Sequence, residues 1–357
     1  MSTAPATVPS AETTGNHRTL SQPIRLGILA ASVVLGAAIV TLLFGWNVLA
    51  VVLVSALIYS VAIYSASAVV EGHRHAVDRL VTAIVTTAFL LAMIPLVSVI
   101  LTIVQNGWHR LDGKFFSYSM EGVGAKETGG AYHAIMGTLI VTALATLISV
   151  PIGLFAAIYL VEYGNKNALS RGLTFFVDVM TGIPSIVAGL FAIGLFTLIF
   201  GPKFQAGIVG AIALSVLMIP VVVRSCEEML KLVPNELREA SLALGVPKWL
   251  TIVKVVMPTA IAGLATGITL AIARVIGETA PLLITMGYAR KVNLNPFDGS
   301  MSALPLFAYQ SYASPGVNKQ ASLDAAWTAA LVLMFIVMLL NIVARLISKF
   351  FAPKTGR

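Results

Sequence analysis

Pairs of opposite charges stand inside stretches that are otherwise apolar. Arg274 and Glu278 lie four positions apart within the stretch 253–286, and this spacing places two side chains on one face of a helix. Ionisable groups in so apolar a setting are expensive, so they face each other or a cavity. Arg274 would offer a forked, permanently charged donor to a passing anion, and Glu278 would weaken the hold so that the anion is released. The alternative is a neutralising pair that only locates the helix.

Arg224 and Glu227 form a second pair, three positions apart, at the end of the apolar stretch 206–227. They could belong to a substrate pathway or to a gate. The stronger alternative is that they are ordinary charges at the cytoplasmic end of a membrane span, where Lys and Arg accumulate. Both interpretations stay open for this pair, as they do for the first.

Other kinds of chemistry have no motif in the sequence. It contains no Gly-x4-Gly-Lys-Ser/Thr loop for nucleotide phosphates, no His, Cys and Asp cluster with metal-ligand spacing, and no Gly-x-Ser-x-Gly elbow of a hydrolase. The single cysteine, Cys226, excludes an intrachain disulfide. We therefore expect no catalytic residue, no metal and no cofactor bound by this chain itself.

The composition places most of the chain in a membrane. Of 357 residues, 58% are hydrophobic and 11% are charged, whereas soluble domains carry about 25% charged residues. The net charge of +8 is spread between the apolar runs rather than gathered in one tail, which argues against a nucleic-acid partner. These proportions predict an all-α integral membrane protein, a polytopic helical bundle in contact with membrane lipid.

Eight apolar stretches are long enough to span a bilayer, which takes about 20 residues. They are 25–45, 48–71, 80–104, 133–161, 173–200, 206–227, 253–286 and 325–351. If both termini are cytoplasmic, the inside segments hold about twice as many Lys and Arg as the outside ones, in keeping with the positive-inside rule. We therefore expect a multi-pass protein of the cytoplasmic membrane with both termini inside and the segments 107–131 and 287–324 outside.

The segment 224–258 has the features of a cytoplasmic docking helix. Asn235 is placed to cap a short helix, Gly245 to end it and Pro247 to begin a second one. Such a helix must bury its apolar stripe, and the groove of a soluble partner would receive it. The positions of that stripe, at helical spacing, are Val233, Leu237, Ala240 and Leu244.

The same segment resembles the EAA loop of bacterial ABC importer permeases. The family pattern reads Glu-Ala-Ala, three residues, Gly, nine residues, then Ile-x-Leu-Pro. The matching positions in this sequence are Glu239, Ala240, Ser241, Gly245 and Pro258. Ser241 replaces the second Ala of the pattern, Val255 replaces Ile and Met257 replaces Leu, and all three changes are size-tolerant. The resemblance implies the fold of type I ABC importer permeases, with a loop that docks into a cleft of a separate ATPase subunit.

The flanking sequence is most similar to the phosphate-specific transport permeases. The similarity rests on the runs 151–163, 181–191, 224–230 and 273–283. It implies two copies of an ATP-binding cassette subunit that hold ATP and Mg, a sister permease subunit and an extracytoplasmic phosphate-binding protein, with phosphate moving inward past Arg274. Sulfate, molybdate or phosphonate stay open as substrates, because permeases for these anions share the loop.

The resemblance also sets the expected domains. Residues 79–351 would form the permease domain, and 25–71 an additional N-terminal transmembrane hairpin without an assigned role in transport. The expected tails are 1–24, flexible and cytoplasmic, and 352–357.

Two other classes of function stay open. A secondary transporter would need ion-coupling residues in several spans, where the sequence offers only Asp178 and Glu162. An intramembrane enzyme would need a catalytic constellation, and the motifs for one are missing from the sequence.

Overall fold

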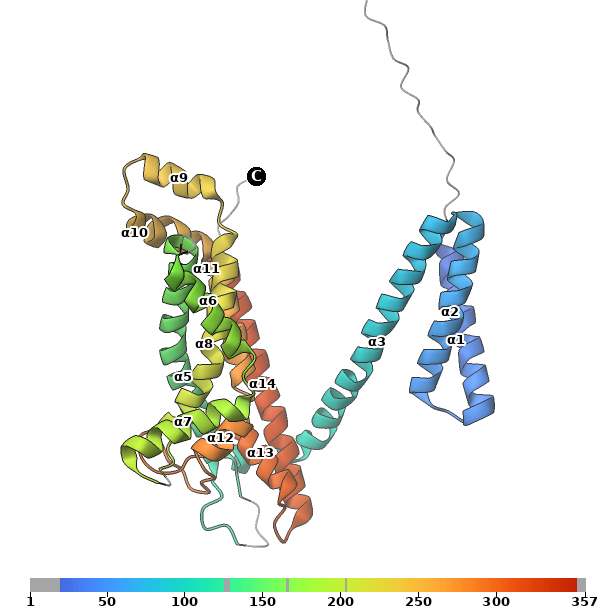
Figure 1. Ribbon diagram of the computed structural model, residues 1–357. Helices are drawn as coiled ribbons and strands as arrows, with labels where there is room; N and C mark the ends of the chain where they lie inside the picture. Colours follow the sequence, from blue (N-terminus) through green and yellow to red (C-terminus); the bar gives the residue numbers. More distant parts are fainter. Residues whose placement is uncertain (1–19, 125–128, 165–166, 203, 352–357) are drawn as a thin grey trace, which may run out of the picture. The chain divides into compact units, whose positions relative to one another are not determined.

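The computed structural model describes residues 20–124, 129–164, 167–202 and 204–351. Every regular element within these ranges is a helix (Figure 1). The chain divides into two compact units, residues 1–101 and 102–357, and helix α3 (His73–Gly107) belongs partly to each. The expected tails lie outside the described residues, except for 20–24.

The first unit is built on a hairpin of two apolar helices, α1 (Gln22–Phe44) and α2 (Val48–Val70). Between them Gly45 has a positive φ of 74°, a conformation that a residue without a Cβ adopts freely. The side chain of Asn47 then caps α2 by accepting a hydrogen bond from the amide of Ala50 at 3.2 Å. The hairpin predicted from the sequence is therefore present.

Glu71 fastens the start of α3 to this hairpin. Its carboxylate accepts two bonds from the guanidinium of Arg79, at 2.6 and 2.7 Å. The hydroxyl of Ser67 and the backbone amide of Leu20 each donate to it at 2.6 Å. These donors, Arg79 first among them, favour the charged form and hold the pKa of Glu71 at about 2, below its ordinary 4.5. The carboxylate is thus fully occupied.

Four long helices form the frame of the second unit (Figure 1), namely α5 (Tyr132–Ile158), α8 (Gly207–Lys231), α11 (Met257–Val275) and α14 (Lys319–Phe351). The main core lies between α5, α8 and α11, around side chains such as Val141 and Leu214. Small residues let these axes approach: a Cβ added to Gly267 of α11 would stand 2.7 Å from the Cβ of Ser225 on α8.

Shorter elements lie at the two ends of this frame. At one end stand α9 (Asn235–Ala243) and α10 (Lys248–Thr251), and at the other α7 (Ser185–Phe200), α12 (Ala280–Thr285) and α13 (Leu304–Ala313) (Figure 1). The rest are a 3-10 turn (Trp108–Arg110), α4 (Gly113–Ser117), α6 (Ala168–Thr181) and two π-helical turns, Tyr159–Tyr163 after α5 and Ile252–Val256 before α11.

The segments predicted to share the outer side lie together. The amide of Met120, from 107–131, donates to the carbonyl of Arg290, from 287–324, at 3.1 Å. Both segments belong to the end of the second unit opposite α9 and α10 (Figure 1). Which end faces the cytoplasm stays a prediction.

The expected spans are largely present. In the part of the chain that the structure describes, seven helices are long and apolar enough to cross a membrane, and α6 with α7 would make an eighth. The predicted span 173–200 is present only as a bent pair, because α6 and α7 meet at an angle of 109°. Pro184 has no N–H to donate to the preceding turn and drives Ile183 away from helical geometry, so the helix breaks at 182–184.

The stretch 253–286 is likewise interrupted. Helix α11 ends at Val275, and α12 begins only at Ala280. Gly277 is a poor helix former and Pro281 lacks the N–H that would continue the ladder, which accounts for the gap. Glu278 therefore lies beyond the end of the helix, and its expected position on one helix face with Arg274 is wrong.

Candidate functional site

A cavity of about 250 Å³ opens where the chain breaks within the second unit. Arg274, on the last turn of α11, and Glu278, just beyond that helix, both line it. The other lining residues come from the end of α6, the start of α7 and the middle of α8, and they include Thr181, Ser185 and Pro220. Irregular backbone is tolerated at membrane depth where it lines such a cavity.

The electrostatics of this cavity suit an anion. Arg274 is exposed and Glu278 half-buried, and no ion pair joins the two or holds Arg274 among the described residues. Helix α7 begins at Ser185 on the cavity wall, and the first N–H groups of a helix have no partner within it. The break thus brings together a guanidinium and the positive end of a helix.

Arg224 and Glu227 are joined to each other and to a second helix. The guanidinium of Arg224 contacts Glu227 at 2.9 Å and is also paired with Asp178 of α6, while Lys231 contacts Glu227 at 2.7 Å. Two carboxylates therefore compensate the charge of Arg224. The network ties α6 to α8, and neither Arg274 nor Glu278 takes part in it.

The turn after α9 forms as its sequence predicts. Gly245 has a φ of 78°, the amide of Gly245 donates to Leu242 at 2.9 Å, and the amide of Val246 donates to Ser241 at 3.3 Å. These two bonds make a Schellman motif, which ends a helix on a left-handed glycine. Helix α10 then begins directly after Pro247.

The start of α9 differs from the prediction. Pro234, not Asn235, is the residue that precedes the first turn, and Asn235 is already helical. The amide oxygen of Asn235 accepts a bond from Arg238 at 3.3 Å instead of capping the backbone. Proline supplies the extended backbone that the cap position needs, so the helix starts there without a side-chain cap.

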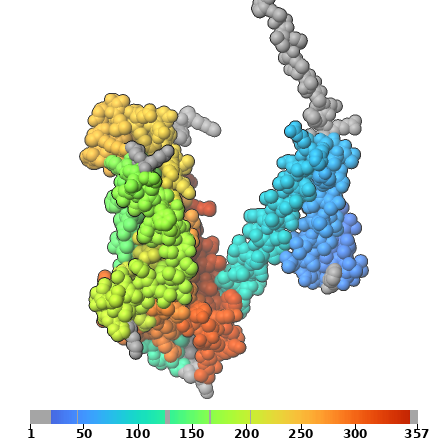
Figure 2. Space-filling model, in the orientation of Figure 1, coloured from blue at the N-terminus to red at the C-terminus, as the bar shows by residue number. Residues whose placement is uncertain are grey.

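The apolar stripe of α9 is mostly uncovered. Val233 is buried, but Leu237 and Ala240 are exposed and Leu244 has 84% of its surface free. Trp249 on α10 is 61% exposed. Figure 2 shows both helices as a projecting mass at one end of the second unit.

The EAA-type residues divide by exposure. Glu239 and Ala240 are exposed, as is Pro258 on the first turn of α11. Ser241 is buried and its hydroxyl bonds that of Thr251 at 2.9 Å, which joins α9 to α10. One part of the pattern therefore faces outward, and another holds the loop together.

The loop is anchored by Arg238, which was not among the predicted functional residues, and by Glu162, which was named only as a possible ion-coupling residue. Arg238 contacts the carboxylate of Glu162, in the π-helical turn after α5, at 2.9 Å, and it donates to the carbonyls of Leu230 at 2.9 Å and Val233 at 2.5 Å. Lys248 donates to the carbonyl of Glu162. The sequence does contain one indication of this anchor: Glu162 is the lone carboxylate in the apolar run 151–163. A buried carboxylate requires a charged partner, so a basic residue was to be expected beside it.

Comparisons with known proteins place the chain among transport proteins. The family model described as the binding-protein-dependent transport system inner membrane component matches residues 149–357. The phosphate transport system permease protein PstA 1 of Mycobacterium tuberculosis is 44% identical over 80% of this chain and 91% of its own length. The protein PstA of Pasteurella multocida is 40% identical over 72% of this chain and 88% of its own length.

A solved structure shares the fold. A chain of a bacterial alginate ABC transporter, crystallised with an alginate-bound periplasmic protein, gives a TM-score of 0.55 at 12% identity. The match covers 78% of this chain and 97% of that one. At this identity the likeness concerns the fold alone.

Proposed function

The chain belongs to the family of binding-protein-dependent transport system inner membrane components, and on that premise we propose that it is the permease subunit of an ABC importer that moves inorganic phosphate inward. The observation that carries the proposal is the 44% identity to a phosphate transport permease over 80% of the chain. The helices suit a multi-pass protein of the inner membrane.

The energy for transport would come from a separate ATPase, which docks on α9. Leu237, Ala240 and Leu244 form an exposed apolar stripe along α9. A helix with such a stripe binds by placing it in the groove of a partner protein. Two copies of the ATP-binding cassette subunit, holding ATP and Mg, would serve this chain and a sister permease. The complex hydrolyses ATP, while this chain supplies no nucleotide site.

Motion of the ATPase would reach the membrane through Arg238. This side chain links α9 to the end of α5 through Glu162 and to the end of α8 through two backbone carbonyls. Because α5 and α8 form the centre of the core, a displaced α9 would move both. This arrangement fits alternating access, in which a bundle rocks around a fixed site.

Phosphate would pass through the cavity at the chain break. Arg274 attracts the anion there together with the N-terminus of α7, and a charge-assisted bond from guanidinium to phosphate is among the stronger polar contacts. Glu278, on the same wall, repels the anion and so speeds its release. An extracytoplasmic phosphate-binding protein would deliver phosphate at the end formed by α7, α12 and α13, with both termini and α9 cytoplasmic.

The pair Arg224 and Glu227 would act as a latch rather than as an anion site. Its charges are already matched by Asp178 and Lys231. The latch holds α6 against α8 beside the bend between α6 and α7, so opening it would let the broken span move. Its role is thus in gating the pathway.

The function is tested by uptake in intact cells. A strain whose gene for this chain is deleted should lose high-affinity uptake of radiolabelled phosphate, and the gene on a plasmid should restore it. Excess unlabelled sulfate or molybdate should not compete. Undiminished phosphate uptake with loss of sulfate or molybdate uptake would assign another oxyanion, and uptake that survives ATP depletion would indicate a secondary transporter.

A further inference from the structure

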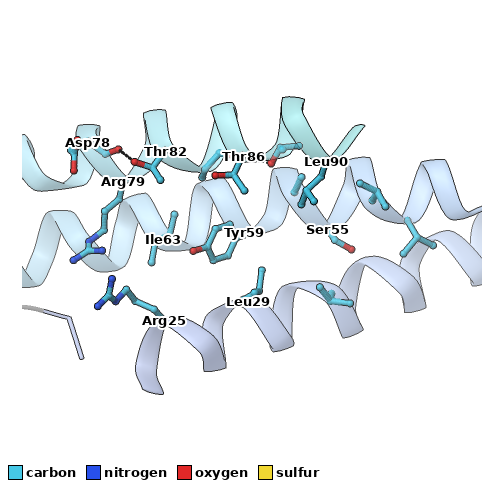
Figure 3. Close-up of a pocket in the computed structure, with 16 residues that line it drawn as sticks. Arg25, Leu29, Ser55, Tyr59, Ile63, Asp78, Arg79, Thr82, Thr86 and Leu90 are labelled. Atoms are coloured by element: carbon cyan, nitrogen blue, oxygen red, sulfur yellow. Dashed lines mark hydrogen bonds between the residues drawn. The ribbon is translucent and has the colours of Figure 1, made fainter. Parts of the chain in front are cut away.

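The first unit contains a cavity of about 470 Å³ between α1, α2 and the start of α3 (Figure 3). Most of its wall is apolar, with side chains such as Leu29, Val33, Ile63 and Leu90. Charged groups gather at one end, where Arg25 and Arg79 extend toward each other's helices (Figure 3). The cavity therefore has an apolar body and a polar mouth.

Arg25 brings an uncompensated positive charge to that mouth. The neighbouring Arg79 is committed to Glu71 by two bonds of 2.6 and 2.7 Å, and Glu71 has no capacity left for Arg25. The Nε of Arg25 is buried and has no hydrogen-bond partner in the described part of the chain. Asp78 also lines the mouth, but no ion pair joins it to Arg25. A buried donor without an acceptor points to a ligand that supplies one.

The dimensions and depth of the cavity match one leaflet of a bilayer. Its wall on α3 runs from Asp78 to Leu90, which at 1.5 Å per residue is about 18 Å, while half of the hydrocarbon core measures about 15 Å. Arg25 stands within the first turns of α1, and Asp78 and Arg79 within the first turns of α3. The polar mouth thus lies at the ends of the spans, where lipid headgroups are found.

We propose that this cavity holds one phospholipid, with its phosphate on Arg25 and an acyl chain along the groove between the three helices. The forked guanidinium matches a phosphate group, and Tyr59, which projects into the groove (Figure 3), adds a hydroxyl. The exposed carboxylate of Asp78 can receive a headgroup ammonium, so phosphatidylethanolamine is the probe of choice. The proposal is independent of the transported substrate.

The first test compares two ligands that differ only in the headgroup. Native mass spectrometry of the assembled complex should show phosphatidylethanolamine retained about tenfold or more over diacylglycerol with the same chains, since the bond to a charged donor is lost in the second. Arg25→Gln should abolish this preference. Arg74→Gln is the matched control, because Arg74 is exposed at the same end and does not line the cavity. An unchanged preference in Arg25→Gln would overturn the proposal.

The second test fills the groove. Thr86→Phe, on the cavity wall, should reduce retention of both ligands by about tenfold or more. Val85→Phe, on the same helix but 62% exposed and outside the wall, should leave retention unchanged. Both substitutions spare the ion pair of Glu71 and Arg79, so melting temperatures should match. Normal lipid retention by Thr86→Phe, or a photo-crosslinker at position 86 that captures a partner subunit rather than lipid, would show that the groove serves another occupant.

Discussion

Replacing Arg238 with methionine should uncouple ATP hydrolysis from transport. The substitution keeps an unbranched apolar stem but removes the guanidinium, and with it the contact of 2.9 Å with Glu162 and the bonds to the carbonyls of Leu230 and Val233. The side chains of Arg238 and Glu162 are only 15% and 7% exposed. Removing one partner of such a buried pair costs about 3–5 kcal/mol, because the other charge stays buried and unpaired.

The control for this change is Lys231→Met. Lys231 also contacts a carboxylate, Glu227 at 2.7 Å, but its side chain is 61% exposed. An ion pair with one end this exposed contributes about 0–1 kcal/mol, and Glu227 keeps its contact of 2.9 Å with Arg224, which still pairs with Asp178. This variant should therefore keep its uptake and its melting temperature. A second variant, Arg238→Met with Glu162→Gln, removes both buried charges and should recover part of the stability without recovering the coupling.

The assay measures phosphate uptake and ATP hydrolysis on the same purified complex, together with its thermal unfolding. Arg238→Met should lower the melting temperature and the ratio of phosphate moved to ATP hydrolysed, whereas Lys231→Met should change neither. If Arg238→Met behaves like Lys231→Met in both measurements, the link from α9 to α5 and α8 is not part of the mechanism.

Three further changes test other parts of the structure. Gly245→Trp forces a large side chain into a left-handed turn, which costs about 1–2 kcal/mol or more of conformational free energy. It should weaken ATPase binding in a pull-down, and normal binding and uptake would show that the turn is not part of the mechanism. Arg274→Gln should lower phosphate uptake at least tenfold while the complex still assembles. The double variant Arg274→Gln with Glu278→Gln should also assemble without transporting phosphate, and recovered transport there would contradict an anion site. Ser117→Cys should react with an impermeant thiol label added outside the cell, and Leu244→Cys should react only when the label reaches the inside. The buried Cys226 gives the background reaction. The reverse labelling pattern would show that the predicted topology is inverted.

The sequence predicts the elements whose cause is local. Gly245 and Pro247 determine the turn after α9 through their own backbone chemistry, and the structure places that turn as expected. The hairpin of α1 and α2 follows in the same way from two apolar runs separated by Gly45 and Asn47. No knowledge of distant contacts was needed in either case.

What the sequence does not predict depends on bends and on distant partners. Proline is tolerated inside membrane helices, as Pro151 and Pro220 show, so Pro184 alone does not distinguish a kink from the 109° bend between α6 and α7. The charge of Arg274 predicts that it faces a partner or a cavity. Hydropathy sums ignore direction, however, so they do not predict that α6, α7 and α8 line that cavity. The bond from Arg238 to Glu162 joins residues 76 positions apart, and no spacing rule reaches that far.

The most direct test of the account is uptake by the purified importer in proteoliposomes. With ATP supplied on the side of the ATPase subunits and the binding protein on the other, vesicles containing this chain should accumulate labelled phosphate against its gradient. They should fail to do so without ATP or with sulfate in place of phosphate. Accumulation of sulfate rather than phosphate, or phosphate uptake that needs neither ATP nor the binding protein, would contradict the assignment.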